Sequence, residues 1–148
     1  MTSGVRAALV AVAVVAADQA VKALVRTTID AGDEVHLFLG IQLVNVRNNG
    51  IAFGLLSGGG AVLVVFAIAA LVALLIFFGR HRYRPLVWLP TGLLIGGAAG
   101  NLLDRLRAGA VTDFIDLPAW PAFNVADIAI TFGVLTLLYV IDGPPSRA

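Results

Sequence analysis

Long apolar runs alternate with shorter polar stretches along this chain. The four runs occupy residues 5–25, 61–78, 86–105 and 123–141, and few charged side chains interrupt them. Each run is close to the ~20 residues that an α-helix needs to cross a bilayer. The pattern predicts an all-α integral membrane protein with four transmembrane helices.

The composition supports this prediction. The chain is 59% hydrophobic and only 13% charged, whereas soluble domains average about 25% charged residues. Its 148 residues suit one domain, so we expect residues 1–148 to form a single membrane-embedded unit. An alternative for residues 5–25 is a signal peptide with Arg6 as its basic end. The apolar run continues past Lys22, which favours a transmembrane helix.

Residues 27–60 form the longest polar segment. Within it, residues 35–46 are rich in Val, Leu, Ile and Phe, a composition typical of short strands. We therefore expect a small β-element between the first two helices. Residues 51–56 are expected to form one helical turn lying on the membrane.

Four crossings place both termini on one side of the membrane. The basic loop at residues 80–84, with Arg6 and Arg147, then belongs inside under the positive-inside rule. The 27–60 segment and a loop at residues 107–121 are expected outside, which makes the β-element extracytoplasmic.

This topology brings the polar residues of separate runs to one depth. The first and third helices run outward and the fourth runs inward, so the outer ends of all three meet near the outer surface. We expect a shared polar pocket there, because ionisable groups in a membrane are costly and usually functional. Its members are Asp18, Lys22, Asn101, Asp104, Arg105, Asn124 and Asp127.

Several of these residues also have structural interpretations. Asp18 and Lys22 are four residues apart and share a helix face, so they can form an internal ion pair or shape a site. Asp104 has a structural or a direct role, and Arg105 is expected to pair with carboxylates or lipid phosphates. The glycines at four-residue spacing in the third run, Gly92, Gly96 and Gly100, predict close helix packing.

Asp127 is the most informative acidic residue, because it lies in an apolar run with no cation within four residues. A second carboxylate beside it would leave one proton shared between an acid and a base. That is the arrangement of aspartic proteases, in which the carboxylate activates water and its protonated partner polarises the carbonyl. Asp113 is one candidate partner, and Asp18, Asp104 and Asp116 compete with it.

Other chemistries have little support. Cysteine is absent, which removes thiolate metal sites and a thiol nucleophile. His36 and His81 have no ligand partners near them in the sequence, so we expect no metal and no cofactor. The net charge of +1, without a basic stripe, argues against nucleic-acid binding.

Five motifs together resemble those of the lipoprotein signal peptidase family, signal peptidase II. They are DQxxK at residues 18–22, RNNGIAF at 47–53, GNLLDR at 100–105, VTDFID at 111–116 and FNVAD at 123–127. Their order, the chain length and the four-helix pattern resemble that family as well.

The resemblance implies an intramembrane aspartic endopeptidase of the bacterial inner membrane. It would cleave prolipoprotein signal peptides just before a diacylglyceryl-modified cysteine, with its active site towards the extracytoplasmic face. It implies Asp113 and Asp127 as the catalytic pair. It also implies a β-cradle within residues 27–50, no metal, contact with membrane lipid, and inhibition by globomycin-type peptides. The pocket and support residues it implies are Asp18, Lys22, Asn48, Asn101, Asp104, Arg105 and Asn124.

Three alternative functions can be distinguished from an aspartic peptidase by the residues that they require. A proton-coupled transporter would place its acidic residues near the midplane, often with inverted repeats, and no repeat is visible. A serine–lysine peptidase would use Ser57 and the only lysine, Lys22. A purely structural subunit would tolerate loss of Asp113 and Asp127 without a change in any reaction.

Overall fold

The computed structural model describes residues 1–50 and 60–142. Within these residues the chain forms four α-helices and one four-stranded antiparallel sheet. The elements in chain order are α1 (Ser3–Thr28), β1 (Glu34–His36), β2 (Gln42–Asn48), α2 (Gly60–His81), α3 (Trp88–Ala108), β3 (Val111–Leu117), β4 (Trp120–Phe123) and α4 (Val125–Asp142).

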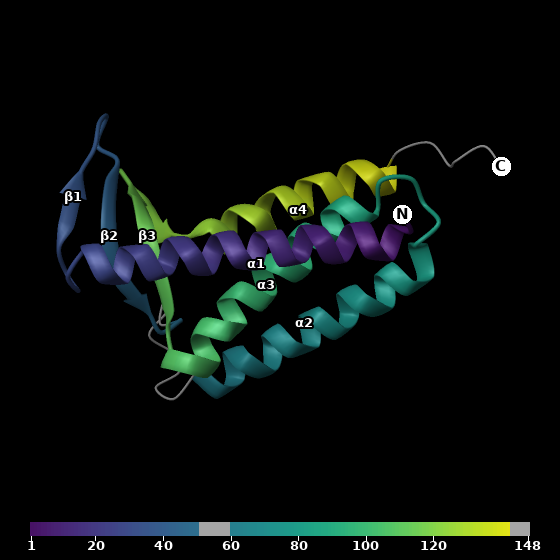
Figure 1. Ribbon diagram of the computed structural model, residues 1–148, viewed down its shortest axis with the longest axis horizontal. Helices are drawn as coiled ribbons and strands as arrows, with labels where there is room; N and C mark the ends of the chain where they lie inside the picture. The colour runs from purple at the N-terminus through teal and green to yellow at the C-terminus, as the bar shows by residue number, and fades with distance from the viewer. Residues whose placement is uncertain (51–59, 143–148) are drawn as a thin grey trace.

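The helices form an elongated bundle with the sheet at one end (Figure 1). α3 contacts α1, α2 and α4, and so lies at the centre of the bundle. The N-terminus, the end of α4 and the connection between α2 and α3 lie together at the end opposite the sheet (Figure 1). Arg80 and His81 at the end of α2 lie there, whereas Arg26, Arg47 and Arg107 line a cavity near the sheet.

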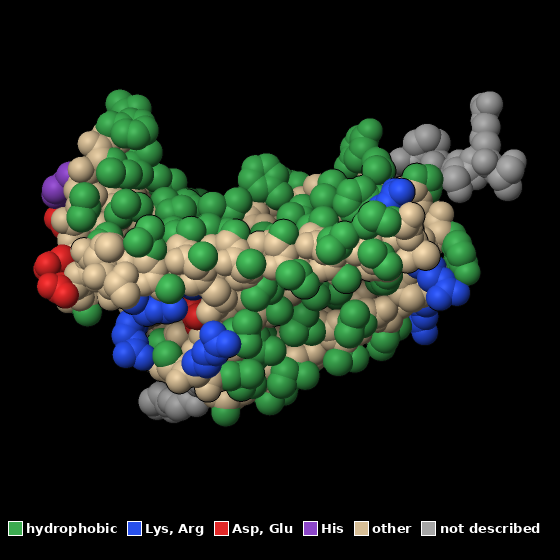
Figure 2. All heavy atoms as spheres, in the orientation of Figure 1, with side chains coloured by type: hydrophobic (Ala, Val, Ile, Leu, Met, Phe, Trp, Pro, Cys, Tyr) green, Lys and Arg blue, Asp and Glu red, His purple; other side chains and the backbone are tan. Residues whose placement is uncertain are grey.

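Three of the described helices are long and apolar enough to cross a membrane: Ser3–Thr28, Ala61–His81 and Val125–Asp142. The apolar stretch of α2 has no buried residue, and such an all-round apolar surface is suited to lipid. Apolar side chains cover much of the bundle surface, while charged ones gather near its two ends (Figure 2). The protein is therefore mostly helical and suited to a membrane, with a small sheet attached.

The glycines of α3 allow its neighbours to approach closely, as predicted. A Cβ atom added at Gly96 would lie 2.7 Å from Val14 Cβ and 2.8 Å from the Ala11 carbonyl oxygen of α1. An added Cβ at Gly97 would lie 2.5 Å from the Ala126 carbonyl oxygen of α4. α3 is thus packed tightly between α1 and α4.

The sheet has the strand order β1-β2-β3-β4. β1 and β2 form a hairpin between α1 and α2, where a small β-element was expected, with Glu34 opposite Val44. A turn joins them at Leu39 and Gly40, whose φ angles are 53° and 78°, and glycine suits that left-handed region.

The prediction of a loop at residues 107–121 is wrong, because much of this segment forms strands. β3 and β4 form a second hairpin there, and β3 pairs with β2, placing Val46 opposite Asp113. The buried Phe114 of β3 packs with Val25 of α1 and with Ile29, the residue after α1, which joins the sheet to the bundle. The helical turn expected at residues 51–56, and Arg147, lie outside the described residues.

Candidate active site

The first turn of α4 holds Asp127 in a reciprocal pair of hydrogen bonds with Asn124. The Asn124 side-chain oxygen accepts from the Asp127 backbone N–H at 3.0 Å. The Asn124 backbone N–H donates to Asp127 Oδ2 at 3.3 Å. This is the capping-box pattern, with Asn124 as the N-cap. The expected helix at residues 123–141 therefore begins at Val125, and Asp127 lies beside the sheet.

A second carboxylate, from α1, also reaches the start of α4. Asp18 Oδ1 accepts from the Ala126 backbone N–H at 2.9 Å. The N-terminus of a helix carries unsatisfied N–H groups and a partial positive charge, so both carboxylates are stabilised there.

Asp113 reaches the same place from β3. Its side chain is almost fully buried. Asp113 Oδ1 accepts from Asn124 Nδ2 at 2.6 Å, and Oδ2 accepts from Asn48 Nδ2 of β2 at 2.8 Å. Asn48 is thus adjacent to the candidate centre. Strand pairing places it there, since β2 and β3 are neighbours.

The pKa of Asp113 is raised above its ordinary value. Burial is the main cause, because it penalises the charged carboxylate. The hydrogen bonds from Asn48 and Asn124 lower the pKa, and the negative charge of Asp127 raises it. Asp113 therefore keeps a proton to higher pH than an exposed aspartate does.

Asparagine side chains connect the two carboxylates. Asn124 donates to Asp113 and also holds Asp127 through its backbone N–H and side-chain oxygen. Asn101 Nδ2 of α3 donates to Asp127 Oδ1 at 2.8 Å, and Asn101 Oδ1 accepts from Asn124 Nδ2 at 3.2 Å. Neutral amides thus fix both acids without adding charge.

Lys22 lies beneath this network and is fully buried. Its ammonium contacts Asp18 Oδ2 at 2.8 Å, Asn101 Oδ1 at 2.9 Å and Asp104 Oδ2 at 3.0 Å. An ammonium has three donors, and three oxygens surround this one. Asp18 and Lys22 therefore form the internal ion pair considered from their spacing. Asp104 completes it from α3.

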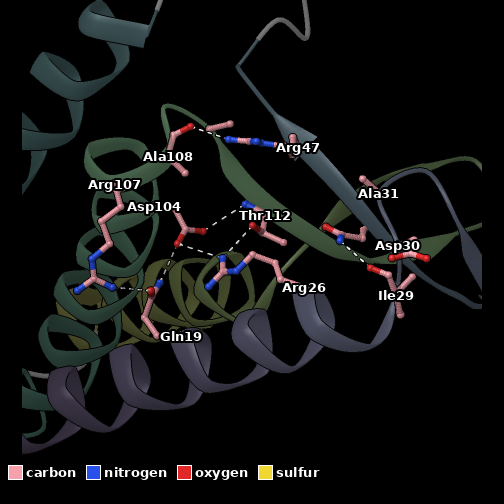
Figure 3. A pocket seen from close by; sticks show the side chains of 12 residues that line it. Gln19, Arg26, Ile29, Asp30, Ala31, Arg47, Asp104, Arg107, Ala108 and Thr112 are labelled. Atoms are coloured by element: carbon pink, nitrogen blue, oxygen red, sulfur yellow. Dashed lines mark hydrogen bonds and ion pairs between the residues drawn. The ribbon is translucent and has the colours of Figure 1, made fainter.

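Gln19 is a residue that the sequence analysis did not single out. Its Nε2 approaches Asp18 Oδ2 at 3.2 Å, the Gly100 carbonyl at 3.3 Å and Asp104 Oδ1 at 3.1 Å. Asp104 also accepts from the Thr112 backbone N–H at 3.2 Å (Figure 3). Gln19 lies inside the DQxxK motif, and its position next to Asp18 could have indicated that it belongs to the site.

Arg105 contacts the cluster less directly. Its guanidinium donates to the Asn101 backbone carbonyl at 3.4 Å, and among the described residues no carboxylate partner is recorded for it. Asp116 lies three residues along β3 from Asp113, so its side chain points to the other face of the strand. No described group of three His, Cys, Asp or Glu residues could hold a metal ion.

An apolar groove of about 440 Å³ runs beside Asp127 between β4 and α4. Its lining includes Trp120, Phe123, Ile128 and Phe132. A carboxylate bordered by aromatic and aliphatic side chains can meet a ligand that is largely apolar.

The fold and this cluster define a membrane-embedded helical protein with a buried centre of carboxylates and amides. Two solved structures of bacterial membrane enzymes share the fold. One matches with a TM-score of 0.85 and 35% identity over 92% of each chain. The other has a TM-score of 0.82 and 34% identity, over 96% of this chain and 93% of that one.

The family model of signal peptidase (SPase) II matches residues 10–141, and the chain belongs to this family. The lipoprotein signal peptidase of Moorella thermoacetica is 43% identical over 136 residues, 88% of this chain and 89% of that protein. The one of Syntrophomonas wolfei is 46% identical over 106 residues, 70% and 71% of the two chains. The resemblance seen in the five motifs is thereby confirmed. The chain is an aspartic peptidase of prolipoprotein signal peptides.

Proposed function

We propose that Asp113 and Asp127 are the catalytic pair, and that they cleave the bond just before a diacylglyceryl-modified cysteine. One observation carries this proposal: Asn124 contacts both acids, donating to Asp113 Oδ1 at 2.6 Å and to Asp127 Oδ2 at 3.3 Å. The negative charge of Asp127 also raises the pKa of Asp113, so the titrations of the two acids are coupled.

The raised pKa of Asp113 supports a division of the starting roles. Asp113 holds the shared proton, and Asp127 is the carboxylate that accepts a proton from the attacking water. As the water oxygen bonds to the scissile carbon, Asp113 protonates the carbonyl oxygen. Asp127 then passes its proton to the amide nitrogen while the C–N bond breaks. Asp113 recovers its proton as the carboxyl product forms.

The remaining predicted residues position this pair. Asn48 and Asn101 each donate to one acid, at 2.8 Å in both cases. Lys22 donates to Asn101 and forms ion pairs with both Asp18 and Asp104. Arg105 acts through the Asn101 backbone. The whole chain then functions as one peptidase unit.

We place the protein in the bacterial inner membrane with four crossings, counting α3, and with the sheet on the extracytoplasmic side. The connection between α2 and α3, with its basic residues, then lies on the cytoplasmic side. The substrate helix and acyl chains would enter from lipid, and the apolar groove beside Asp127 suits them. A globomycin-type peptide would compete for the same space.

The serine–lysine alternative is disfavoured by the surroundings of Lys22. A lysine general base must be neutral, yet this ammonium lies within 3.0 Å of carboxylates from α1 and α3. Ser57 lies outside the described residues. We expect Ser57→Ala to retain cleavage.

The central experiment removes each acid while keeping its shape. Asp113→Asn and Asp127→Asn in proteoliposomes should each lower cleavage of a diacylglyceryl-modified prolipoprotein by at least ~10²-fold, the usual scale of acid–base catalysis. Product would be followed by gel shift. Asp116→Asn, the same substitution on the opposite face of β3, is the matched control and should retain activity.

Thermal unfolding in detergent checks that each variant is folded. A folded Asp113→Asn or Asp127→Asn protein that cleaves at the normal rate would contradict the pair. An equal loss of activity in Asp116→Asn would mean that Asp113 is not distinguished from Asp116 as the catalytic acid of β3, and would contradict the proposed pair.

A further inference from the structure

A second cavity, of about 390 Å³, lies on the other side of β3 from the carboxylate pair. Successive side chains on a strand point to opposite faces, so Thr112 lines this cavity while Asp113 faces Asn124. The proposed reaction uses none of the three arginines that line the cavity. These are Arg26 of α1, Arg47 of β2 and Arg107 of α3.

The cavity carries excess positive charge. Two acids, Asp30 and Asp104, accompany the three arginines in its lining. Asp104 is nearly fully buried and lies 3.0 Å from the Lys22 ammonium and 3.8 Å from the Arg26 guanidinium. The three guanidinium groups come from separate elements around the cavity (Figure 3). Lys and Arg atoms likewise flank a hollow below α1 on the molecular surface (Figure 2).

The Arg26 guanidinium already contacts Thr112 Oγ1 at 3.0 Å and Asp104 Oδ1 at 3.8 Å, whereas those of Arg47 and Arg107 retain donors for a ligand. A guanidinium has five N–H donors. Within the described part of the chain, Arg47 donates to the Ala108 carbonyl at 2.7 Å and Arg107 to Gln19 Oε1 at 3.4 Å. No other hydrogen bond is recorded there for these two exposed side chains. A planar guanidinium with free donors matches the oxygen atoms of a phosphate.

An apolar groove of about 490 Å³ lies between α1 and α3, the two helices that contribute Arg26 and Arg107 to the cavity. Val15 and Leu103 line the groove, and Gln19 and Arg107, one helical turn further on, line the cavity. The groove thus runs from the cationic cavity towards the middle of the bundle. Its lining is almost entirely apolar: Ala11, Val12, Val15, Ala16, Ala99, Leu102, Leu103 and Leu106.

We propose that this cavity and groove together form a binding site for an anionic phospholipid of the leaflet that borders the sheet. The phosphate binds the arginines, and one acyl chain lies along the groove between α1 and α3. A free phosphate would use only the cationic part. A zwitterionic lipid would bring a second positive charge towards the arginines, so an anionic headgroup is the better match.

The test is a lipid titration of the full-length protein in detergent, followed by native mass spectrometry. The probes are phosphatidylglycerol, phosphatidylcholine with the same acyl chains, and glycerol phosphate. We expect the wild-type protein to prefer phosphatidylglycerol over both others. The preference should fall as salt rises, because screening weakens exposed charge pairs.

Two variants separate the two halves of the site. Arg107→Gln removes a cation and should weaken phosphatidylglycerol binding about tenfold, the scale of one hydrogen bond to a charged group. Ala16→Phe fills the groove and should weaken binding of phosphatidylglycerol but not of glycerol phosphate. The matched controls are Arg82→Gln, in the basic loop, and Ala70→Phe, on exposed α2. Both should bind like the wild type.

Equal affinity for phosphatidylglycerol and phosphatidylcholine would overturn the proposal. So would unchanged binding in both Arg107→Gln and Ala16→Phe, or glycerol phosphate binding as tightly as the lipid. Arg107 and Ala16 are exposed, and the unfolding temperature of each variant in detergent verifies its fold. None of these outcomes depends on Asp113 or Asp127, so the lipid experiment does not test the proposed catalytic pair, and the cleavage experiment does not test the lipid site.

Discussion

The chemistry of Asp113 depends on which neighbours donate to it. The two asparagine donors oppose the effect of burial, and the nearby Asp127 charge adds to it. Since the unfolded chain releases this proton first, stability falls as the pH rises from the ordinary value of 3.8 through the raised pKa. Burial of the ionised carboxylate therefore costs folding free energy above that pH range.

Removing one donor should move the pH dependence of cleavage. In Asn48→Ala the hydrogen bond to Asp113 Oδ2 is lost, and with it a contribution that lowers the pKa. The pKa of Asp113 should rise further, so the shared proton is kept to higher pH. We expect the alkaline limb of the kcat/KM profile to shift upward.

Asn45→Ala is the matched control for this experiment. Asn45 is on the same strand, but its side chain donates to the Ile29 carbonyl at 2.8 Å. Its pH profile should match that of the wild-type protein. A downward shift of the alkaline limb in Asn48→Ala would contradict the assigned role of Asp113.

At the scale of elements, the position of α3 depends on glycine. Gly96→Ala would place a Cβ 2.8 Å from the Ala11 carbonyl oxygen, and α1 would have to move. Overpacking of this kind costs about 1–3 kcal/mol, which exceeds the gain in helix propensity from replacing glycine by alanine. We expect a lower unfolding temperature in detergent.

Gly79→Ala provides the comparison for Gly96→Ala. Gly79 lies in α2, and an added Cβ there meets nothing within 4 Å. That variant should be as stable as the wild-type protein or slightly more stable, because alanine favours a helix by about 0.5–1 kcal/mol. Equal unfolding temperatures for the two variants would argue against tight packing of α1 on α3.

The sequence predicted the long elements well and the short ones less well. The apolar runs mark the helices because each is long and nearly free of charge. β3 and β4 were missed because they are short, Pro118 and Pro121 resemble loop residues, and the partner strand β2 lies far away in the chain. The start of α4 was placed early because Phe123 is apolar, although Asn124 is the residue that caps the helix.

At the scale of the whole molecule, the candidate site draws on five elements. The sequence predicts an outward run for α1 and α3 and an inward run for α4, and hence that their polar ends meet. Lys22, Asn101 and Asp127 do lie in one network. Periodicity along one helix did not reveal the contact of Asn48 with Asp113, because strand pairing across the bundle creates it. Only the family resemblance indicated that Asn48 belongs to the site.

Chelation tests the metal requirement of the whole enzyme. The described residues contain no cluster of three His, Cys, Asp or Glu able to hold a metal ion, and the proposed mechanism needs only two carboxylates and water. We expect EDTA to leave the rate of prolipoprotein cleavage unchanged. Loss of activity that only added zinc restores would contradict the proposed mechanism.

The ion pair buried between α1 and α3 has a consequence for biosynthesis. Lys22 finds one carboxylate on its own helix and another on Asp104, which the ribosome adds about eighty residues later in the chain. The nascent first helix therefore enters the bilayer before its charges are fully matched. The insertion machinery has to hold that helix until the third one arrives, and a protein truncated before α3 would leave a lysine and an aspartate facing lipid.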